Sequence, residues 1–243
     1  MPSSVPAIHE IWVYLSGTPL LALFLTLTAY QVGLMIYERA GRNPVANPVA
    51  IAVAIVAVAI TLIDMPYKTY FEGAQFVHFL LGTATVSLAV PIYRGLTGLG
   101  KRIVPLLVAL LAGGATSIVS SVAIAWALGA DMQIIGGMYA KSVTAPIGMG
   151  IAERLSVSPT LTAVFAVCTG ILGAILGRFV LDFVGSKAWW QRGFALGVAA
   201  HGIGTSRAFS VNKEAGTYAS LGMGLNGILG AVLIPIAVRQ FTS

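Results

Sequence analysis

Six long stretches of this chain contain no Asp, Glu, Lys or Arg, and this pattern constrains the fold more than any other feature. Each stretch approaches or exceeds the roughly 20 residues that an α-helix needs to cross the hydrocarbon core of a bilayer. Only 9% of the residues are charged, against about 25% in soluble domains, so the sequence predicts an integral membrane protein. The stretches are Pro19–Tyr37, Asn43–Ile63, Gly73–Tyr93, Ile103–Leu128, Ser156–Gly177 and Ala215–Val238.

The expected fold class is an all-α integral membrane protein, because these runs lack the short alternating strands of a membrane β-barrel. Six full transmembrane helices are predicted. Two more apolar stretches, around Lys141 and around His201, are interrupted by polar residues and are expected to form broken or re-entrant helical segments. One transmembrane domain is expected over residues 19–243, after an N-terminal segment 1–18 that does not read as a signal peptide.

Internal similarity favours a transporter-like inverted repeat, although chance matches explain it equally well. Asn47–Ile51 resembles Ala145–Met149, and Gly82–Thr85 resembles Gly204–Arg207. The corresponding halves would be residues 19–128 and 132–239, the second of which carries both broken segments.

Membrane topology explains the net charge of +6 better than nucleic-acid binding does, because the basic residues lie mostly between apolar runs. The links at 38–42 and 94–102 are basic and are therefore expected in the cytoplasm. Lys187 and Arg192 fall outside if both broken segments cross the membrane. They fall inside if the first segment re-enters, and the charge rule prefers this second arrangement.

The first polar cluster runs from Lys141 to Pro146. Pro146 has no amide hydrogen and disfavours helix at the residue before it, so a helix must break or restart here. Ser142 and Thr144 are expected to cap the restarted helix. Free amides at a helix start, beside the Lys141 ammonium and two hydroxyls, are typical of a site for a small anion such as a carboxylate.

The second cluster, His201 to Arg207, predicts the same chemistry. Gly202 allows the backbone to leave helical geometry, and the planar guanidinium of Arg207 can grip a carboxylate at two points. His201 titrates near neutral pH and is the candidate for proton coupling, although a lone histidine more often packs between helices. The other members predicted to bind substrate are Gly204, Thr205 and Ser206.

Plainer roles compete with a shared site. Lys141 or Arg207 alone would snorkel to the interface or pair with Glu153 or Glu214. Asn47, which precedes a proline, either starts the second crossing or reaches the site from the opposite half. The shared site is favoured because each cluster joins a charge, hydroxyls and a helix breaker within seven residues.

No catalytic arrangement emerges from the sequence. It contains no paired carboxylates within a span, no metal-ligand spacing, no Ser-His-acid grouping and no phosphate-binding loop. We therefore expect neither an enzyme nor a metal or other cofactor. Cys168 is the single cysteine, which excludes an internal disulfide.

Over about Pro19 to Val238, the chain resembles the LrgB/CidB family in four motifs: Asn47–Pro48, Pro91–Tyr93, Ala140–Ile147 and Ala200–Ala208. The resemblance implies a multi-pass protein of the bacterial inner membrane, described as holin-like or antiholin-like and linked to murein hydrolases and cell lysis. It also implies transport, because the plastidal glycolate/glycerate translocator is similar to a fusion of this family with its small LrgA/CidA partner, and bacterial members are connected with pyruvate uptake. The family's usual Thr-Thr-Pro reads Thr144-Ala145-Pro146 here, and its usual Ala-Arg reads Ser206-Arg207.

A carrier needs one small internal pocket, whereas a holin needs helices with polar faces that line a large lesion. Because polarity is concentrated in two places, we expect a transporter of small monocarboxylates (glycolate, glycerate, lactate or pyruvate) that couples to protons or exchanges its substrates. The alternative is a holin-like or antiholin-like protein that modulates murein hydrolase activity and lysis. The expected partners are the carboxylate and an LrgA/CidA-like small membrane protein, and the sequence leaves open whether a homo-oligomer forms.

Overall fold

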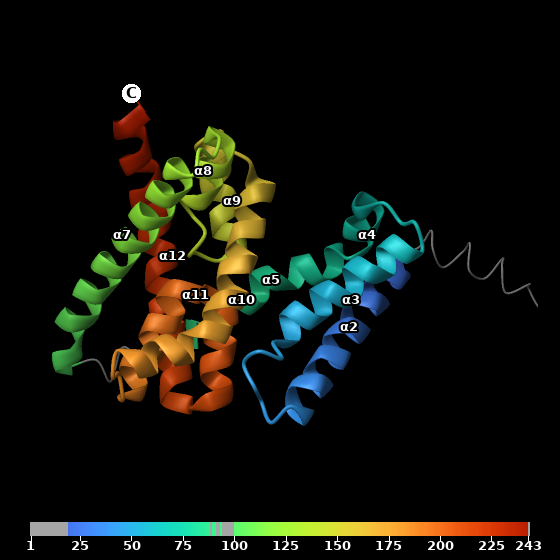
Figure 1. Cartoon of the computed structure of the whole chain (residues 1–243), viewed down its shortest axis with the longest axis horizontal. Coiled ribbons are helices and arrows are strands. Elements are labelled where there is room, and N and C mark those ends of the chain that lie inside the picture. Colours follow the sequence, from blue (N-terminus) through green and yellow to red (C-terminus); the bar gives the residue numbers. More distant parts are fainter. Residues whose placement is uncertain (1–18, 88, 91–92, 94–99, 243) are drawn as a thin grey trace, which may run out of the picture. The chain divides into compact units, whose positions relative to one another are not determined.

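The protein is entirely helical wherever its regular structure is described. The computed structural model describes residues 19–87, 89–90, 93 and 100–242 (Figure 1). The predicted N-terminal segment 1–18, the Pro91-Ile92 motif and the basic residues at 94–99 lie outside these residues. Contacts divide the chain into two compact units, Met1–Ser87 and Leu88–Ser243, which are taken in turn below.

Four described helices are long and apolar enough to cross a membrane, which agrees with an all-α membrane protein. The first, in the N-terminal unit, is α2 (Pro19–Arg39). In the C-terminal unit, a single 3-10 turn, η1 (Gly100–Arg102), leads into α7, and the other two long helices follow the broken segments. They are α7 (Ile103–Ala127), α10 (Pro159–Phe183) and α12 (Lys213–Thr242).

The N-terminal unit does not confirm six complete crossings. The run Asn43–Ile63 forms only α3 (Pro48–Leu62), about 22 Å long, because its first residues make a turn and its helix begins at an Asn47 cap. Asn47 Oδ1 accepts hydrogen bonds from Val49 N at 2.9 Å and Ala50 N at 3.1 Å, as predicted for a helix start. The unit continues with α4 (Tyr67–Gly73) and α5 (Gln75–Ser87), the described part of the third run.

The first broken segment is interrupted where the sequence predicted. Helix α8 (Met132–Met138) ends, residues 139–144 are not helical, and α9 (Ala145–Arg154) restarts with Pro146 in its first turn. Both short helices pack on the first half of α10: a Cβ at Gly137 would lie 3.1 Å from the Phe165 ring, and one at Gly148 would lie 3.2 Å from Thr162. The segment therefore turns back beside α10.

The second broken segment, α11 (Trp189–Val211), folds into a helical hairpin. Its backbone leaves helical geometry at Ala200 (φ −126°, ψ 16°) and His201 (φ 39°, ψ −129°). A Cβ at Gly204 would lie 2.7 Å from the carbonyl oxygen of Leu196, so the second limb returns alongside the first. Limbs of 12 and 10 residues reach about 18 and 15 Å, half of a roughly 30 Å hydrocarbon core.

Glycines set the second hairpin against the other half of α10. Gly177 faces Leu196, Gly173 faces Ala200, and Gly170 faces the His201 ring, which agrees with the tight packing role that glycine density suggests. Figure 1 shows α8 and α9 at one end of α10 and α11 at the other. The two hairpins therefore enter the C-terminal unit from opposite ends.

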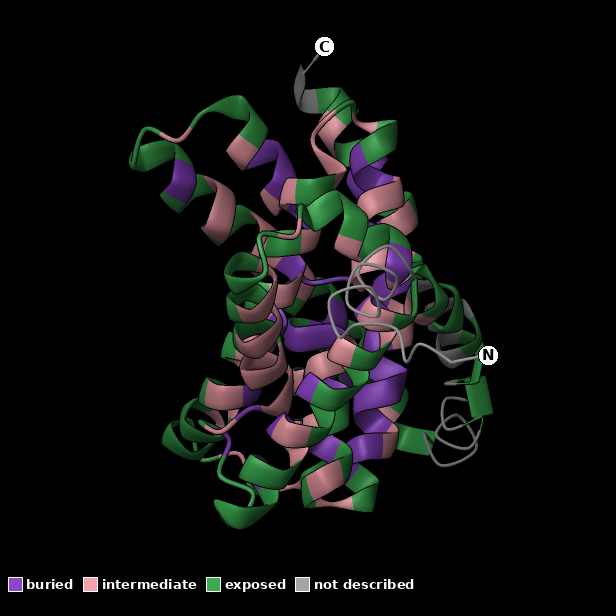
Figure 2. Ribbon diagram, turned by 90° about the vertical axis from the view of Figure 1, so that its right-hand side faces the viewer, coloured by how far each residue is buried: buried purple, intermediate pink, exposed green. Residues whose placement is uncertain are grey.

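The core of the C-terminal unit lies where α7, α11 and α12 meet. Its buried members include Leu106 and Leu110 from α7, Phe194 and Val198 from α11, and Leu221 from α12. Figure 2 shows most helices carrying both buried and exposed stretches, as expected where the remaining apolar surface meets lipid. Because α7 packs with the following helices, it does not group with the expected first half, residues 19–128, and the repeat between halves is not confirmed.

Candidate functional site

Lys141, in the non-helical link between α8 and α9, forms a small polar cluster with two serines. Its Nζ donates hydrogen bonds to Ser117 Oγ at 2.8 Å and to Ser142 Oγ at 3.2 Å. The two hydroxyls also contact each other at 2.8 Å, and Ser142 is buried. No carboxylate of the described chain forms an ion pair with Lys141, so hydroxyls are its only printed polar contacts and its charge is not neutralised.

Asn226, on α12, joins the two interrupted segments. Its Nδ2 donates to the carbonyl oxygen of Ser142 at 3.0 Å and to that of Val198 at 3.2 Å. Ser142 belongs to the α8–α9 link and Val198 lies just before the turn of α11. The two segments therefore converge, as the shared-site prediction requires, through a residue that the prediction did not include.

The cluster lies near the middle of the long helices. Ser117 is about 21 Å along α7 from its start, and Asn226 is about 20 Å along α12. Both helices are long enough to span the bilayer, so these side chains lie near its centre if the helices cross it fully. A lysine there is costly unless it has polar partners, which makes a functional role the default expectation.

The start of α9 leaves hydrogen-bonding capacity beside this cluster. Thr144 occupies the N-cap position, but its side chain makes no capping bond and its buried Oγ1 has no partner within the described structure. Ser142 bonds to Lys141 and Ser117 instead of capping the helix. The prediction that Ser142 and Thr144 cap α9 is therefore wrong, because the lysine ammonium engages one hydroxyl and the other points elsewhere.

A groove of about 750 Å³ opens onto the cluster between α7, α12 and the α8–α9 link. Most of its lining is apolar, including Leu110, Ile118 and Leu229, and Ser142 and Asn226 add polar atoms to it. A Cβ at Gly114 would lie 3.5 Å from Asn226 Oδ1, so the absent side chain leaves space beside the amide.

His201 forms the turn of the α11 hairpin and is buried. Its Nδ1 accepts from Gly202 N at 2.9 Å, and its Nε2 lies 2.8 Å from the carbonyl oxygen of Ala166 on α10. These contacts fit a neutral ring with hydrogen on Nε2. A φ of 39° is unusual for a side-chain-bearing residue, and the ring's bonds offset that strain.

Gly202 was the predicted break, but the break comes one residue earlier. A glycine permits many conformations without selecting one, whereas the His201 ring bonds stabilise this turn. Of the remaining predicted members, Gly204 is buried against the first limb, Thr205 Oγ1 donates to the His201 carbonyl at 2.7 Å, and Ser206 is exposed. None of these three contacts the Lys141 cluster through a printed bond.

Arg207 lies in a different place from Lys141. It lines a cavity of about 320 Å³ together with Arg178, Lys187 and Arg192, near the ends of α10 and α11. Six helical residues separate it from His201, about 9 Å along the returning limb. The expectation that Lys141 and Arg207 grip one carboxylate is therefore corrected, because the hairpin carries Arg207 back towards its starting end.

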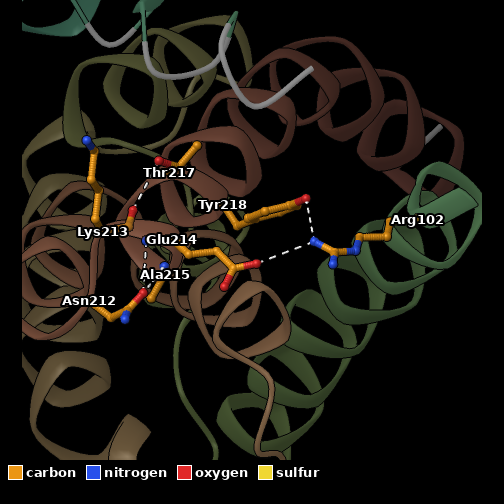
Figure 3. Close-up of polar contacts among 7 residues, drawn as sticks. All are labelled: Arg102, Asn212, Lys213, Glu214, Ala215, Thr217 and Tyr218. Atoms are coloured by element: carbon orange, nitrogen blue, oxygen red, sulfur yellow. Dashed lines mark hydrogen bonds and ion pairs between the residues drawn. The ribbon is translucent and has the colours of Figure 1, made fainter. Parts of the chain in front are cut away.

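The same end of the C-terminal unit is held by Arg102, which precedes α7 (Figure 3). Its Nη1 donates to Tyr218 at 2.9 Å and lies 3.4 Å from Glu214 Oε1, both on α12. The guanidinium also lies over the Trp190 ring, 5.1 Å from its centre. This ion pair gives Glu214 a partner other than Lys141 or Arg207.

Sequence reasoning missed Ser117 and Asn226. Asn226 was detectable as a lone carboxamide inside the run Ala215–Val238, where a polar side chain needs a partner. Asn47 belongs to the N-terminal unit, where its carboxamide oxygen caps α3, and its contribution to the site stays a prediction. The described residues contain no group of three His, Cys, Asp or Glu side chains that would hold a metal ion.

Comparisons with known proteins place the chain among bacterial membrane proteins. It is 29% identical over 221 residues to the holin-like protein CidB of Staphylococcus epidermidis, covering 91% of this chain and 96% of the relative. It is 32% identical over 216 residues to the uncharacterized protein YwbG of Bacillus subtilis, covering 89% and 96%, and 27% identical over 222 residues to CidB of Staphylococcus aureus, covering 91% and 96%. No solved structure matches the chain. The LrgB-like family model matches residues 26–240, and the chain therefore belongs to the LrgB-like family.

Proposed function

We propose that the protein is a carrier of small monocarboxylates such as glycolate, glycerate, lactate or pyruvate. The observation that carries this proposal is the Lys141 ammonium, which binds Ser117 and Ser142 and has no carboxylate partner in the described chain. A buried cation with hydroxyl neighbours gains most from an anionic solute, because the anion neutralises the charge and accepts its hydrogen bonds.

The surroundings of Lys141 suit a carboxylate of a few atoms. The uncapped start of α9 supplies positive dipole ends, and the orphan Thr144 hydroxyl supplies a donor for a hydroxyl or keto oxygen. The adjoining groove provides room. In the proposed complex, Lys141 holds the carboxylate while Ser142 and Thr144 meet the second oxygen-bearing group.

Two hairpins that approach one point from opposite ends are the arrangement that alternating access requires. Each would open the site to one side when its tip withdraws, while the other stays closed. The corresponding order, a long helix followed by a hairpin in both 103–154 and 159–211, supports an inverted repeat within the C-terminal unit. This repeat differs from the pairing of 19–128 with 132–239.

Charge supports an orientation for this carrier in a bacterial inner membrane. Seven basic and two acidic residues gather at the end that carries Arg102, whereas the opposite end has two of each. The positive-inside rule therefore places the first end in the cytoplasm. A cysteine replacing Lys213 in a Cys168→Ser background should react with an impermeant reagent only from the cytoplasmic side, and labelling from outside would reverse the assignment. The basic residues are Lys101, Arg102, Arg178, Lys187, Arg192, Arg207 and Lys213, and the acidic ones are Asp182 and Glu214; the other end has Asp131, Glu153, Arg154 and Arg239.

A holin-like function is the second candidate, and the names of the staphylococcal relatives favour it more directly than they favour transport. A holin-like or antiholin-like role would involve membrane lesions or the control of murein hydrolases, with an LrgA/CidA-like protein or further copies of this chain as partners. Co-purification with such a small membrane protein would support the assembly but not separate the two functions.

Solute flux separates them. Purified protein in liposomes should take up labelled glycolate or pyruvate while retaining a trapped dye larger than these acids. Lys141→Met should abolish uptake and leave the fold intact, whereas Lys213→Met, an exposed lysine outside the cluster, should leave uptake unchanged. Dye leakage would support a pore, and the absence of both uptake and leakage would overturn the carrier proposal.

A further inference from the structure

The cavity at the Arg207 end has a composition unlike the rest of the C-terminal unit. Four of its lining residues are cations and one, Asp182, is an anion. Arg192 Nη1 lies 2.7 Å from Asp182 Oδ1, and Arg178 Nε lies 3.6 Å from Asp182 Oδ2. One carboxylate therefore serves two guanidiniums, and the cavity wall retains a net charge of three positive units.

The cavity wall is rigid where it must be and open where a ligand would enter. The Arg192 side chain is only 14% exposed, donates to the Ser186 carbonyl at 2.7 Å, and lies 5.8 Å from the Trp189 ring centre. Lys187 is exposed and makes no ion pair in the described structure. A volume of about 320 Å³ falls in the range of small-molecule pockets, roughly 300–1,000 Å³.

We infer that this cavity binds the phosphate group of an anionic phospholipid. Arginine forks and a lysine match phosphate oxygens, and basic pockets between transmembrane helices recognise such headgroups. Exposed apolar side chains leave the cavity along α10, where acyl chains would lie. These are Leu176 (49% exposed), Phe179 (55%) and Val180 (57%).

The position of the cavity fits a lipid better than a soluble phosphate. It lies where α10 ends and α11 begins, beside Trp189, the type of aromatic residue that marks a membrane–water interface. The inference is independent of the transported solute, because none of the cavity's lining residues belongs to the Lys141 cluster.

Lipid binding to the full-length protein in detergent tests the inference. Native mass spectrometry would measure the dissociation constants of phosphatidylglycerol and phosphatidylcholine, with inorganic phosphate as a competitor in a separate arm. Each cation near a headgroup contributes about fivefold in affinity, so the Lys187→Gln/Arg207→Gln variant should bind phosphatidylglycerol about 25-fold more weakly. Lys213→Gln removes the same charge at the same end, outside the cavity, and should bind as the unmodified protein does.

Each outcome decides the inference. Preference for phosphatidylglycerol that is lost in the double variant and kept in Lys213→Gln supports it. Equal losses in both variants, or no preference between the lipids, overturn it, and so does displacement by millimolar inorganic phosphate without any lipid preference, which would indicate a soluble anion. If the double variant does not fold, Lys187→Gln alone applies the same criteria with a fivefold expected loss, because that side chain is exposed.

Discussion

Asn226 has a role that few other residue types can take. One amide nitrogen donates to two carbonyl oxygens, those of Ser142 and Val198, where both backbones leave or approach the end of regular helix. Carbonyls freed by helix interruptions need donors, because water is scarce at this depth. The side chain thus satisfies both interruptions and keeps their separation fixed.

Asn226→Asp should remove this connection without a change of size. A carboxylate has no hydrogen to donate and faces two carbonyl oxygens, so we expect a stability loss of about 1–3 kcal/mol and loss of uptake. Asn43→Asp is the matched control, because Asn43 Oδ1 only accepts, from Val45 N at 3.0 Å, and a carboxylate preserves that bond. Thermal unfolding in detergent measures both, and equal midpoints for the two variants would contradict the bridging role.

His201 as the carrier of a coupling proton stays a prediction. In the neutral ring Nδ1 accepts from Gly202, so a second proton would break that bond and loosen the turn. The helices packed on the turn set Gly113, Gly170 and Met223 beside this hairpin, none of which titrates, and the cation joined to it through Asn226 is Lys141.

His201→Gln tests the proton role. If this ring carries the proton, uptake by the unmodified protein falls as the pH rises through neutral, and the variant transports with a flatter pH profile, since glutamine does not titrate. Uptake measured between acidic and basic external pH gives the profile. An identical pH dependence in the variant would remove His201 from proton coupling and leave it as the residue that forms the turn.

Single residues were predicted with uneven success, for physical reasons. Pro146 marks its break directly, because a missing amide hydrogen is a property of the residue itself. Arg207 was misplaced because nearness in sequence was taken for nearness in space, although a helix separates residues by about 1.5 Å each. Ser117 carried no local signal, since its role depends on the lysine that reaches it from another segment.

The two hairpins are short helices whose stability comes from their packing. Helix α8 has 7 residues and α9 has 10, too few for stability in isolation. Glycines on both hairpins and on α10 allow close backbone approach, and this replaces the missing helix length with contact area. A side chain at such a position displaces the hairpin.

Gly170→Ala should disturb the α11 turn. The added Cβ would lie 2.7 Å from His201 Cε1, which forces the ring away from the Ala166 carbonyl, so we expect a cost of about 1–3 kcal/mol. Gly150→Ala in α9 is the matched control, because nothing lies within 4 Å of its Cβ and alanine favours helix by about 0.5–1 kcal/mol. Unfolding midpoints should move in opposite directions, and a stabilised Gly170→Ala would contradict the packing described.

Helices were predicted best where apolar length alone decides them. The runs at Ile103–Leu128, Ser156–Gly177 and Ala215–Val238 became α7, α10 and α12 with small shifts at their ends. The run Asn43–Ile63 misled, because an uncharged stretch also accommodates turn residues. Re-entry was left open by the sequence, since it depends on which half of α10 each hairpin packs against.

The C-terminal unit as a whole brings opposed hairpins to one polar point within an otherwise apolar body. Polarity confined to one point is economical for a carrier, whereas a pore needs polar faces along its length. Exposed side chains of α7 and α10 are mostly apolar, which suits contact with lipid. The family membership is established by the comparisons, and the carrier proposal rests on this local geometry.

The distance between a bound acid and Lys141 tests the site most directly. Solid-state NMR on protein with ¹⁵N-labelled lysine side chains in liposomes, with glycolate labelled at its carboxyl carbon, would measure carbon–nitrogen dipolar coupling. The predicted result is a coupling for a separation of about 3.5 Å, as in a charge-assisted hydrogen bond, that disappears in Lys141→Met. No coupling to any lysine, or a coupling that survives in Lys141→Met, would contradict the account.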